Sequence, residues 1–167
     1  MIVSGGSGAP LLGVGDGLLT MVIPAFNAAA TIERAVVSAL ASGAEKAIVV
    51  DDGSTDATFA VAQGSGAQVV RQENQGAGAA RSVGLSRVAT EFVMYLDADD
   101  CLIAEGVAAI LSALQRVPDA VGVVGGYSVT GGSGQRRQVH CPWLEGISTS
   151  SLLKRGYAPA PPASIVW

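Results

Sequence analysis

The chain has 167 residues, 49% of them hydrophobic and 14% charged, and a formal net charge of −4 at pH 7. This length and composition fit one folded domain with a buried core and exclude a disordered chain. The negative charge argues against a general nucleic-acid-binding surface, and no apolar run of about 18 residues predicts a membrane-spanning helix.

Strands and helices are predicted to alternate from about residue 18 onward. The first 17 residues are rich in Gly and Ser and predict a flexible lead-in without a signal peptide. Short apolar runs predict buried strands at 18–24, 46–52, 67–72, 91–97 and 120–129. Apolar residues at helical spacing predict helices at 31–43, 54–63, 76–88 and 103–115. The expected N-caps are Thr31 for the first helix and Ser54 or Thr55 for the second.

Less regular structure is predicted after residue 130. Residues 131–134 are typical of a hairpin turn into a strand at 135–140, and 147–155 is a short helical candidate. Repeated strand–helix–strand units predict an α/β fold with a mostly parallel central sheet flanked by helices. We therefore expect a lead-in at 1–17, an α/β domain at 18–130, and a hairpin with an incomplete segment at 131–167.

Two cysteines, Cys101 and Cys141, lack metal-binding spacing, and His140 is the only histidine. A structural zinc site is therefore not expected, and reduced thiols in a cytoplasmic protein are the simplest interpretation. The inner face of the membrane is an alternative location.

Polar clusters follow three predicted strands, after Pro24, at 51–56 and at 97–100. In parallel α/β sheets ligands bind outside the carboxyl ends of the strands, which predicts a site at this edge. Asp97, Asp99 and Asp100 would repel one another by roughly 4 kcal/mol per pair at an effective dielectric of about 20. A hard divalent cation, Mg²⁺ or Mn²⁺, would neutralise them. The alternative is a solvated acidic loop.

The cluster at 51–56 and a fourth one at 74–81 each admit a functional and a structural interpretation. The carboxylates of DDGSTD (51–56) could accept hydrogen bonds from a base or a ribose, or the segment could be only a strand-to-helix turn. In NQGAGAAR (74–81) the glycines allow close approach to a ligand, and Arg81 could pair with phosphate. The alternative for this segment is close packing of a helix rich in small residues.

Four segments occur together in order: VIPAFN (22–27), VVDDGSTD (49–56), NQGAGAARSVGL (74–85) and YLDADD (95–100). They resemble glycosyltransferase family 2, inverting enzymes of the GT-A fold, over about residues 18–130. The resemblance implies a sheet of the nucleotide-diphospho-sugar transferase type. It also implies transfer of a sugar from a nucleoside-diphosphate sugar, expected to be a UDP-sugar, to an acceptor hydroxyl, with Mn²⁺ or Mg²⁺. Cell-wall or polysaccharide biosynthesis is the implied context.

The resemblance also implies roles for individual residues. Those implied to bind the nucleotide are Pro24, Ala25, Phe26, Asp52, Gly76, Arg81, Asp97 and Asp99. Asp52 would bind the base, and Gly76 and Arg81 would lie near the base and diphosphate. Asp97 and Asp99 would match the family's DxD motif. Asp99 and Asp100 would hold the ribose and the metal ion.

Two departures from the family pattern bear on turnover. The family's general base lies well beyond the hairpin, whereas no acidic residue follows Glu145 here, and Ser82 stands where the family commonly has Asn. We therefore assign no catalytic residue, and a non-catalytic nucleotide-sugar-binding protein is the alternative function. A nucleotidyltransferase is disfavoured, since 22–31 has neither a glycine-rich phosphate loop nor a basic residue. The donor sugar, the acceptor (carbohydrate, lipid-linked or protein) and the oligomeric state are not predicted.

Overall fold

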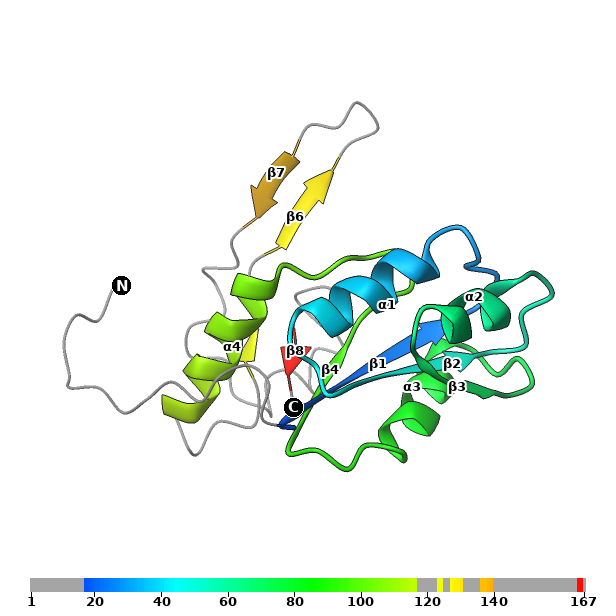
Figure 1. The fold of residues 1–167 in the computed structure, drawn as a ribbon, viewed down its shortest axis with the longest axis horizontal. Coiled ribbons are helices and arrows are strands. Elements are labelled where there is room, and N and C mark those ends of the chain that lie inside the picture. The colour runs from blue at the N-terminus through cyan, green and yellow to red at the C-terminus, as the bar shows by residue number, and fades with distance from the viewer. Residues whose placement is uncertain (1–16, 117–122, 125–126, 131–135, 140–164, 167) are drawn as a thin grey trace, which may run out of the picture.

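The structure, a computed structural model, describes residues 17–116, 123–124, 127–130, 136–139 and 165–166 (Figure 1). The predicted lead-in, apart from Gly17, and the helical candidate at 147–155 lie outside these residues. No helix in the described ranges is long and apolar enough to cross a membrane.

The central sheet has the strand order β3-β2-β1-β4-β8-β5 (Figure 1). Its parallel part consists of β1 (Leu19–Ala25), β2 (Lys46–Asp51), β3 (Gln68–Arg71) and β4 (Phe92–Tyr95). The short strand β8 (Ile165–Val166) runs antiparallel between β4 and β5 (Val123–Val124). A separate hairpin joins β6 (Tyr127–Thr130) and β7 (Arg136–Val139), which confirms the predicted hairpin.

Helices cover both faces of the parallel sheet. They are α1 (Ile32–Ala41), α2 (Thr58–Gly64), α3 (Ala77–Leu85) and α4 (Ala104–Arg116). The larger core cluster joins α1, α2 and α4 to side chains such as Val49, while a smaller cluster joins Ile48 and Val50 to Ala80 of α3. Figure 1 accordingly has α1 and α3 on opposite sides of the sheet. Adjacent residues of β2 therefore face different helices, which explains why its sequence is continuously apolar rather than alternating.

The glycine in the middle of α3 permits a close approach to the sheet. A Cβ atom at Gly84 would lie 2.3 Å from Cγ1 of Val22, a distance that real Cβ atoms do not adopt. Gly84 therefore serves close packing on β1, and Ala80 packs on β2, whereas a Cβ atom at Gly76 or Gly78 would meet nothing within 4 Å. The same packing fixes the position of Arg81 on the helix.

The expected N-cap of α2 was wrong, and that of α1 was correct in position only. Neither Ser54 nor Thr55 caps α2, which begins at Thr58 and whose first N–H is accepted by the Asp56 carboxylate. Thr31 is the N-cap residue of α1, but its hydroxyl donates to the carbonyl of Ala28 and accepts no N–H of the helix. The hydroxyl groups of these residues bind polar partners before or outside the helix, such as Asn27 for Ser54 and Thr55, and so they accept no N–H of its first turn.

The two remaining differences lie in the later part of the chain. The single strand predicted at 120–129 is instead divided between β5 and β6, which belong to different sheets. Ile103, the first residue of the helix predicted at 103–115, precedes α4 and is 58% exposed. The buried residues of α4 are Val107, Leu111 and Leu114.

Candidate functional site

A pocket of about 430 Å³ lies at the carboxyl edge of the sheet, next to the ends of β1 and β4. The chain passes from β1 to β2 and β3 on one side of β1, and then crosses to β4 on the other side. This reversal creates a topological switch point between β1 and β4, where open α/β sheets bind ligands. The pocket therefore occupies the position that the sheet topology favours for a ligand.

Five of the predicted site residues line this pocket. They are Pro24 and Phe26 at the end of β1, Arg81 on α3, and Asp97 and Asp99 after β4. The tertiary fold thus brings together residues from three of the four family-like segments, those at 22–27, 74–85 and 95–100.

The other four predicted residues do not line the pocket: Ala25, Asp52, Gly76 and Asp100. Ala25 is the last residue of β1 and is buried, with its carbonyl accepting the N–H of Asp52. Gly76 precedes α3 with a φ of +87°, a left-handed conformation that glycine adopts without strain. Gly76 thus shapes the start of the helix that carries Arg81.

Sequence reasoning missed five residues that line the pocket: Asn27, Ala28, Thr31, Ala77 and Ala98. Asn27 carried a usable signal, because asparagine directly after a strand is one of the few residues that adopt positive φ. Its φ is in fact +49°. The alanines carry no chemical signal of their own, and only their position in the fold reveals them.

Arg81 and Asp97 form the central ion pair of the pocket. Nη2 of Arg81 donates to Oδ1 of Asp97 at 2.7 Å, and both side chains remain partly exposed. Nε of Arg81 is buried and has no hydrogen-bond partner among the described residues. Because the guanidinium is partly exposed and lines the pocket, it can bind a further anionic group there, such as a phosphate oxygen.

Asp52 is buried, and its carboxylate organises the segment that leads into α3. Its Oδ1 accepts hydrogen bonds from Nε2 of Gln72 at 2.8 Å and from the N–H of Gln75 at 2.9 Å. Its Oδ2 accepts the N–H of Gly76 at 2.8 Å. Burial alone would raise the pKa of Asp52, but these three donors outweigh it and hold the pKa below its ordinary value. Asp52 is therefore an ionised acceptor.

The acidic loop after β4 has the opposite electrostatic character. Partial burial, and then the negative charges of Asp99 and Asp97, raise the pKa of Asp100 above its ordinary value. Asp99 and Asp100 are both exposed. The repulsion that the sequence predicted is therefore present, and it is not fully compensated by the protein.

The acidic loop fits a divalent cation that is bound jointly with a ligand. In the described part of the chain no three His, Cys, Asp or Glu side chains converge to enclose a metal ion. Magnesium, however, usually binds through one or two carboxylates together with substrate phosphates and water. The hard oxygen donors of Asp99 and Asp100, with their uncompensated charge, meet that requirement, whereas Asp97 is engaged by Arg81.

Comparison with known protein families gives one extensive match. The family profile described as "Glycosyl transferase family 2" matches residues 20–162. An uncharacterized glycosyltransferase of Mycobacterium bovis is 33% identical over 134 residues, covering 78% of this chain and 56% of that protein. The succinoglycan biosynthesis protein ExoU of Rhizobium meliloti is 46% identical over 87 residues, covering 48% of this chain and 25% of that protein. The chain thus spans about half, or less, of these relatives' lengths.

Solved structures agree with the sequence relatives. Glucosyl-3-phosphoglycerate synthase from Mycobacterium tuberculosis, in complex with Mg²⁺ and uridine diphosphate, is 25% identical with a TM-score of 0.53. The similarity covers 65% of this chain and 44% of that one. This synthase is a glycosyltransferase of the GT-A fold, and the similarity confirms the predicted fold class.

Proposed function

The chain belongs to glycosyl transferase family 2, and from this premise we propose that its pocket binds a nucleoside-diphosphate sugar as the donor for transfer to an acceptor hydroxyl. One observation carries the proposal. A guanidinium, an acidic loop and an exposed aromatic side chain meet in one pocket at the switch point of the sheet. These are the groups that a diphosphate, a metal ion and a nucleobase require.

Phe26 and Asp52 are the proposed contacts of the base. Phe26 lines the pocket and is 50% exposed, so its ring has a free face on which a base can stack. Stacking of a base on an aromatic side chain contributes about 1–3 kcal/mol. An ionised carboxylate offers about four acceptor positions, and the protein fills three at Asp52. The remaining position could accept the N–H of a uracil ring, and the relative solved with uridine diphosphate supports that donor.

Arg81 and the first turn of α3 are the proposed contacts of the diphosphate. Ala77, the first residue of α3, lines the pocket, so the positive end of the helix dipole is nearby. Arg81 lines the pocket and adds a fixed positive charge. Both features stabilise negative charge as it accumulates on the departing diphosphate.

Asp99 and Asp100 are the proposed ligands of Mn²⁺ or Mg²⁺, as the Mg²⁺-bound relative supports. Such an ion, when bound, supplies Lewis-acid stabilisation of the diphosphate leaving group. Asp97 then keeps Arg81 in place through their ion pair.

The proposed reaction is a single displacement with inversion. The acceptor oxygen bonds to C1 of the sugar while the bond from C1 to the diphosphate oxygen breaks. The hydroxyl proton passes to a carboxylate base outside the residues that line the pocket, because Asp97 is paired with Arg81 and Asp99 is a proposed metal ligand. A carbohydrate acceptor is supported by the similarity to a succinoglycan biosynthesis protein.

Calorimetry with uridine diphosphate and Mn²⁺ tests donor binding. We expect saturable binding that weakens at least tenfold without the metal, and that weakens further with uridine alone, which lacks phosphates. Absence of binding to UDP, GDP and ADP with either metal would refute the proposal. A transfer and hydrolysis assay with UDP-sugars then separates the enzyme from a protein that only holds the donor.

A further inference from the structure

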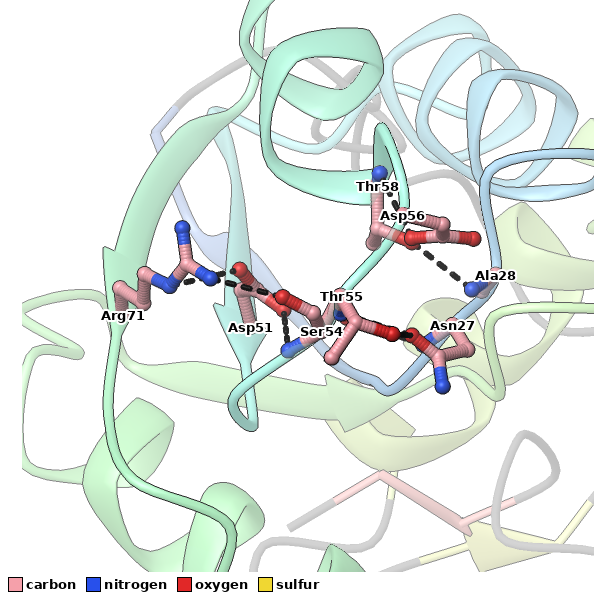
Figure 2. Close-up of polar contacts among 8 residues, drawn as sticks. All are labelled: Asn27, Ala28, Asp51, Ser54, Thr55, Asp56, Thr58 and Arg71. Carbon is pink, nitrogen blue, oxygen red and sulfur yellow. Dashed lines mark hydrogen bonds and ion pairs between the residues drawn. The ribbon is translucent and has the colours of Figure 1, made fainter.

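The loops that follow β1 and β2 are joined by a set of side-chain hydrogen bonds across 27 to 30 residues of sequence (Figure 2). We call this set the loop clamp. It consists of Asn27, Ser54, Thr55, Asp56 and Thr58. The proposed donor contacts do not include Asp56 or Thr58, and no part of the pocket wall is formed by either residue.

Thr58 and Asp56 hold the backbone of the first loop. The hydroxyl oxygen of Thr58 accepts the N–H of Ala28 at 2.8 Å, and the same hydroxyl donates to Oδ1 of Asp56. Oδ2 of Asp56 accepts the N–H of Ala29 at 3.1 Å. Two consecutive backbone N–H groups are therefore bound by side chains of another loop. Because Thr58 is fully buried, its hydroxyl cannot move away without disturbing the core.

Asn27 forms the second half of the loop clamp. Its N–H donates to Oγ of Ser54 at 2.9 Å, and its Oδ1 accepts the N–H of Thr55 at 2.9 Å and the Thr55 hydroxyl at 3.2 Å. These contacts hold Asn27 at a φ of +49°, which is uncommon for a residue other than glycine. Ser54 is itself fixed, since its N–H donates to Asp51 and its carbonyl accepts Nη2 of Arg71 (Figure 2).

The backbone held in this way forms one wall of the pocket. Phe26, Asn27 and Ala28 all line the pocket, and they lie directly before or within the clamped segment. The side chain of Phe26 is half exposed, so its position depends on the backbone around it. A binding site gains affinity when its walls are ordered before the ligand arrives.

We propose that Asp56 and Thr58 are positioning residues of the donor site: by binding the N–H groups of Ala28 and Ala29, they hold the Phe26–Ala28 wall in its ligand-binding position. The inference rests on the proposed function, because it assumes that the donor enters this pocket. A purely structural role predicts that donor affinity falls whenever stability falls. The positioning role predicts that donor affinity depends on whether residue 58 carries a hydroxyl group, even between variants of similar stability.

Two substitutions at Thr58 separate these roles. Thr58→Val keeps the buried volume but removes the hydroxyl, whereas Thr58→Ser keeps the hydroxyl but removes a buried methyl group. We expect both to lower the melting temperature, but only Thr58→Val to weaken UDP binding in the presence of Mn²⁺, by about tenfold. Thr58→Ser should bind UDP within about threefold of the unaltered chain. Hydrogen exchange should accelerate at the amides of Ala28 and Ala29 in Thr58→Val alone.

Thr90→Val is the matched control at the opposite edge of the sheet. The Thr90 hydroxyl lies 2.8 Å from that of Thr20 and 2.9 Å from the carbonyl oxygen of Phe92. Its loss should lower the melting temperature with no more than a twofold change in UDP affinity. Asp56→Asn, at an exposed position, is a second probe that leaves the core intact, and should weaken UDP binding about threefold to tenfold.

The outcomes separate the two hypotheses. UDP affinity that follows melting temperature across all four variants would overturn the positioning role. Equal UDP binding by Thr58→Val and the unaltered chain would also overturn it, even with faster exchange at Ala28 and Ala29. If the unaltered chain binds no UDP, the proposed function itself fails, and the positioning role fails with it.

Discussion

Two loops at the same edge of the sheet, one after β2 and one after β4, place their carboxylates in opposite environments. In the loop after β2, at 51–58, Asp51, Asp52 and Asp56 each accept hydrogen bonds from backbone N–H groups. In the loop after β4, at 97–100, the side chains of Asp99 and Asp100 accept no hydrogen bond from any described residue. The carboxylates of the first loop are bound by the protein itself, whereas Asp99 and Asp100 of the second loop are free to bind a ligand.

The pKa values show the consequence of this difference. Hydrogen bonds lower the pKa of Asp52 despite its burial, and those from Thr58 lower the pKa of Asp56. Partial burial and neighbouring negative charge raise the pKa of Asp100. Aspartate therefore serves structure in the first loop, whereas in the second its side chains repel one another, and a bound cation would relieve that repulsion.

Removing a carboxylate from the loop at 51–58 is expected to have the largest effect on stability. Asp52→Ala leaves the N–H groups of Gln75 and Gly76 and the amide of Gln72 without their acceptor. We expect the free energy of unfolding to fall by about 3 kcal/mol, measured by urea denaturation. Asp99→Ala, in the other loop, is the control and should change stability by less than about 1 kcal/mol. Equal losses for the two variants would contradict the distinction.

Arg81 connects the acidic loop to α3 and provides the next largest test. Arg81→Ala should weaken UDP binding by about 2 kcal/mol, or about 30-fold, because a charged donor to the diphosphate is lost. Arg81→Lys should retain part of the affinity, since it keeps the charge but not the planar set of donors. Calorimetry measures both. An unchanged affinity for Arg81→Ala would remove the guanidinium from the proposed site.

The pH dependence of stability sharpens the comparison. The pKa of Asp52 is lower in the folded than in the unfolded chain, so its contribution to stability is present above about pH 4. That contribution is lost as the pH falls through the folded-state value. Asp52→Asn should therefore flatten the fall in stability below about pH 4, measured by urea denaturation at several pH values. A slope identical to that of the unaltered chain would show that the hydrogen-bonded carboxylate does not govern acid unfolding.

The smallest effect is expected at Asp100, and it has the opposite sign. Because the folded-state pKa of Asp100 is raised, its ionisation disfavours the fold as the pH rises above about 4. Without divalent metal at pH 7, Asp100→Asn should raise the free energy of unfolding, by less than about 1 kcal/mol. The same variant should show a smaller rise in melting temperature when Mn²⁺ and UDP are added. A lower stability for Asp100→Asn would mean that the acidic loop is not repulsive.

Much of the fold and part of the site followed from the sequence. The continuous apolar runs predicted the four parallel strands, because strands covered on both faces need apolar residues in succession. The polar clusters at their ends predicted a site at the sheet edge where the pocket lies, and Phe26, Arg81 and Asp97 line that pocket. The function of Ser54 and Thr55 was missed, because a hydroxyl near a helix start looks the same whether it caps that helix or binds a distant loop.

The sequence by itself determined the order of strands and helices and the segments that carry polar chemistry, since both depend on patterns within about ten residues. Only the tertiary structure decided which oxygen atoms serve the protein and which remain for a ligand. The donors to Asp52 lie up to 24 residues away, and Ala28 lies 30 residues from the Thr58 hydroxyl that binds its N–H. Hydrogen bonds at such separations depend on how strands pair and helices pack, and no local pattern records them.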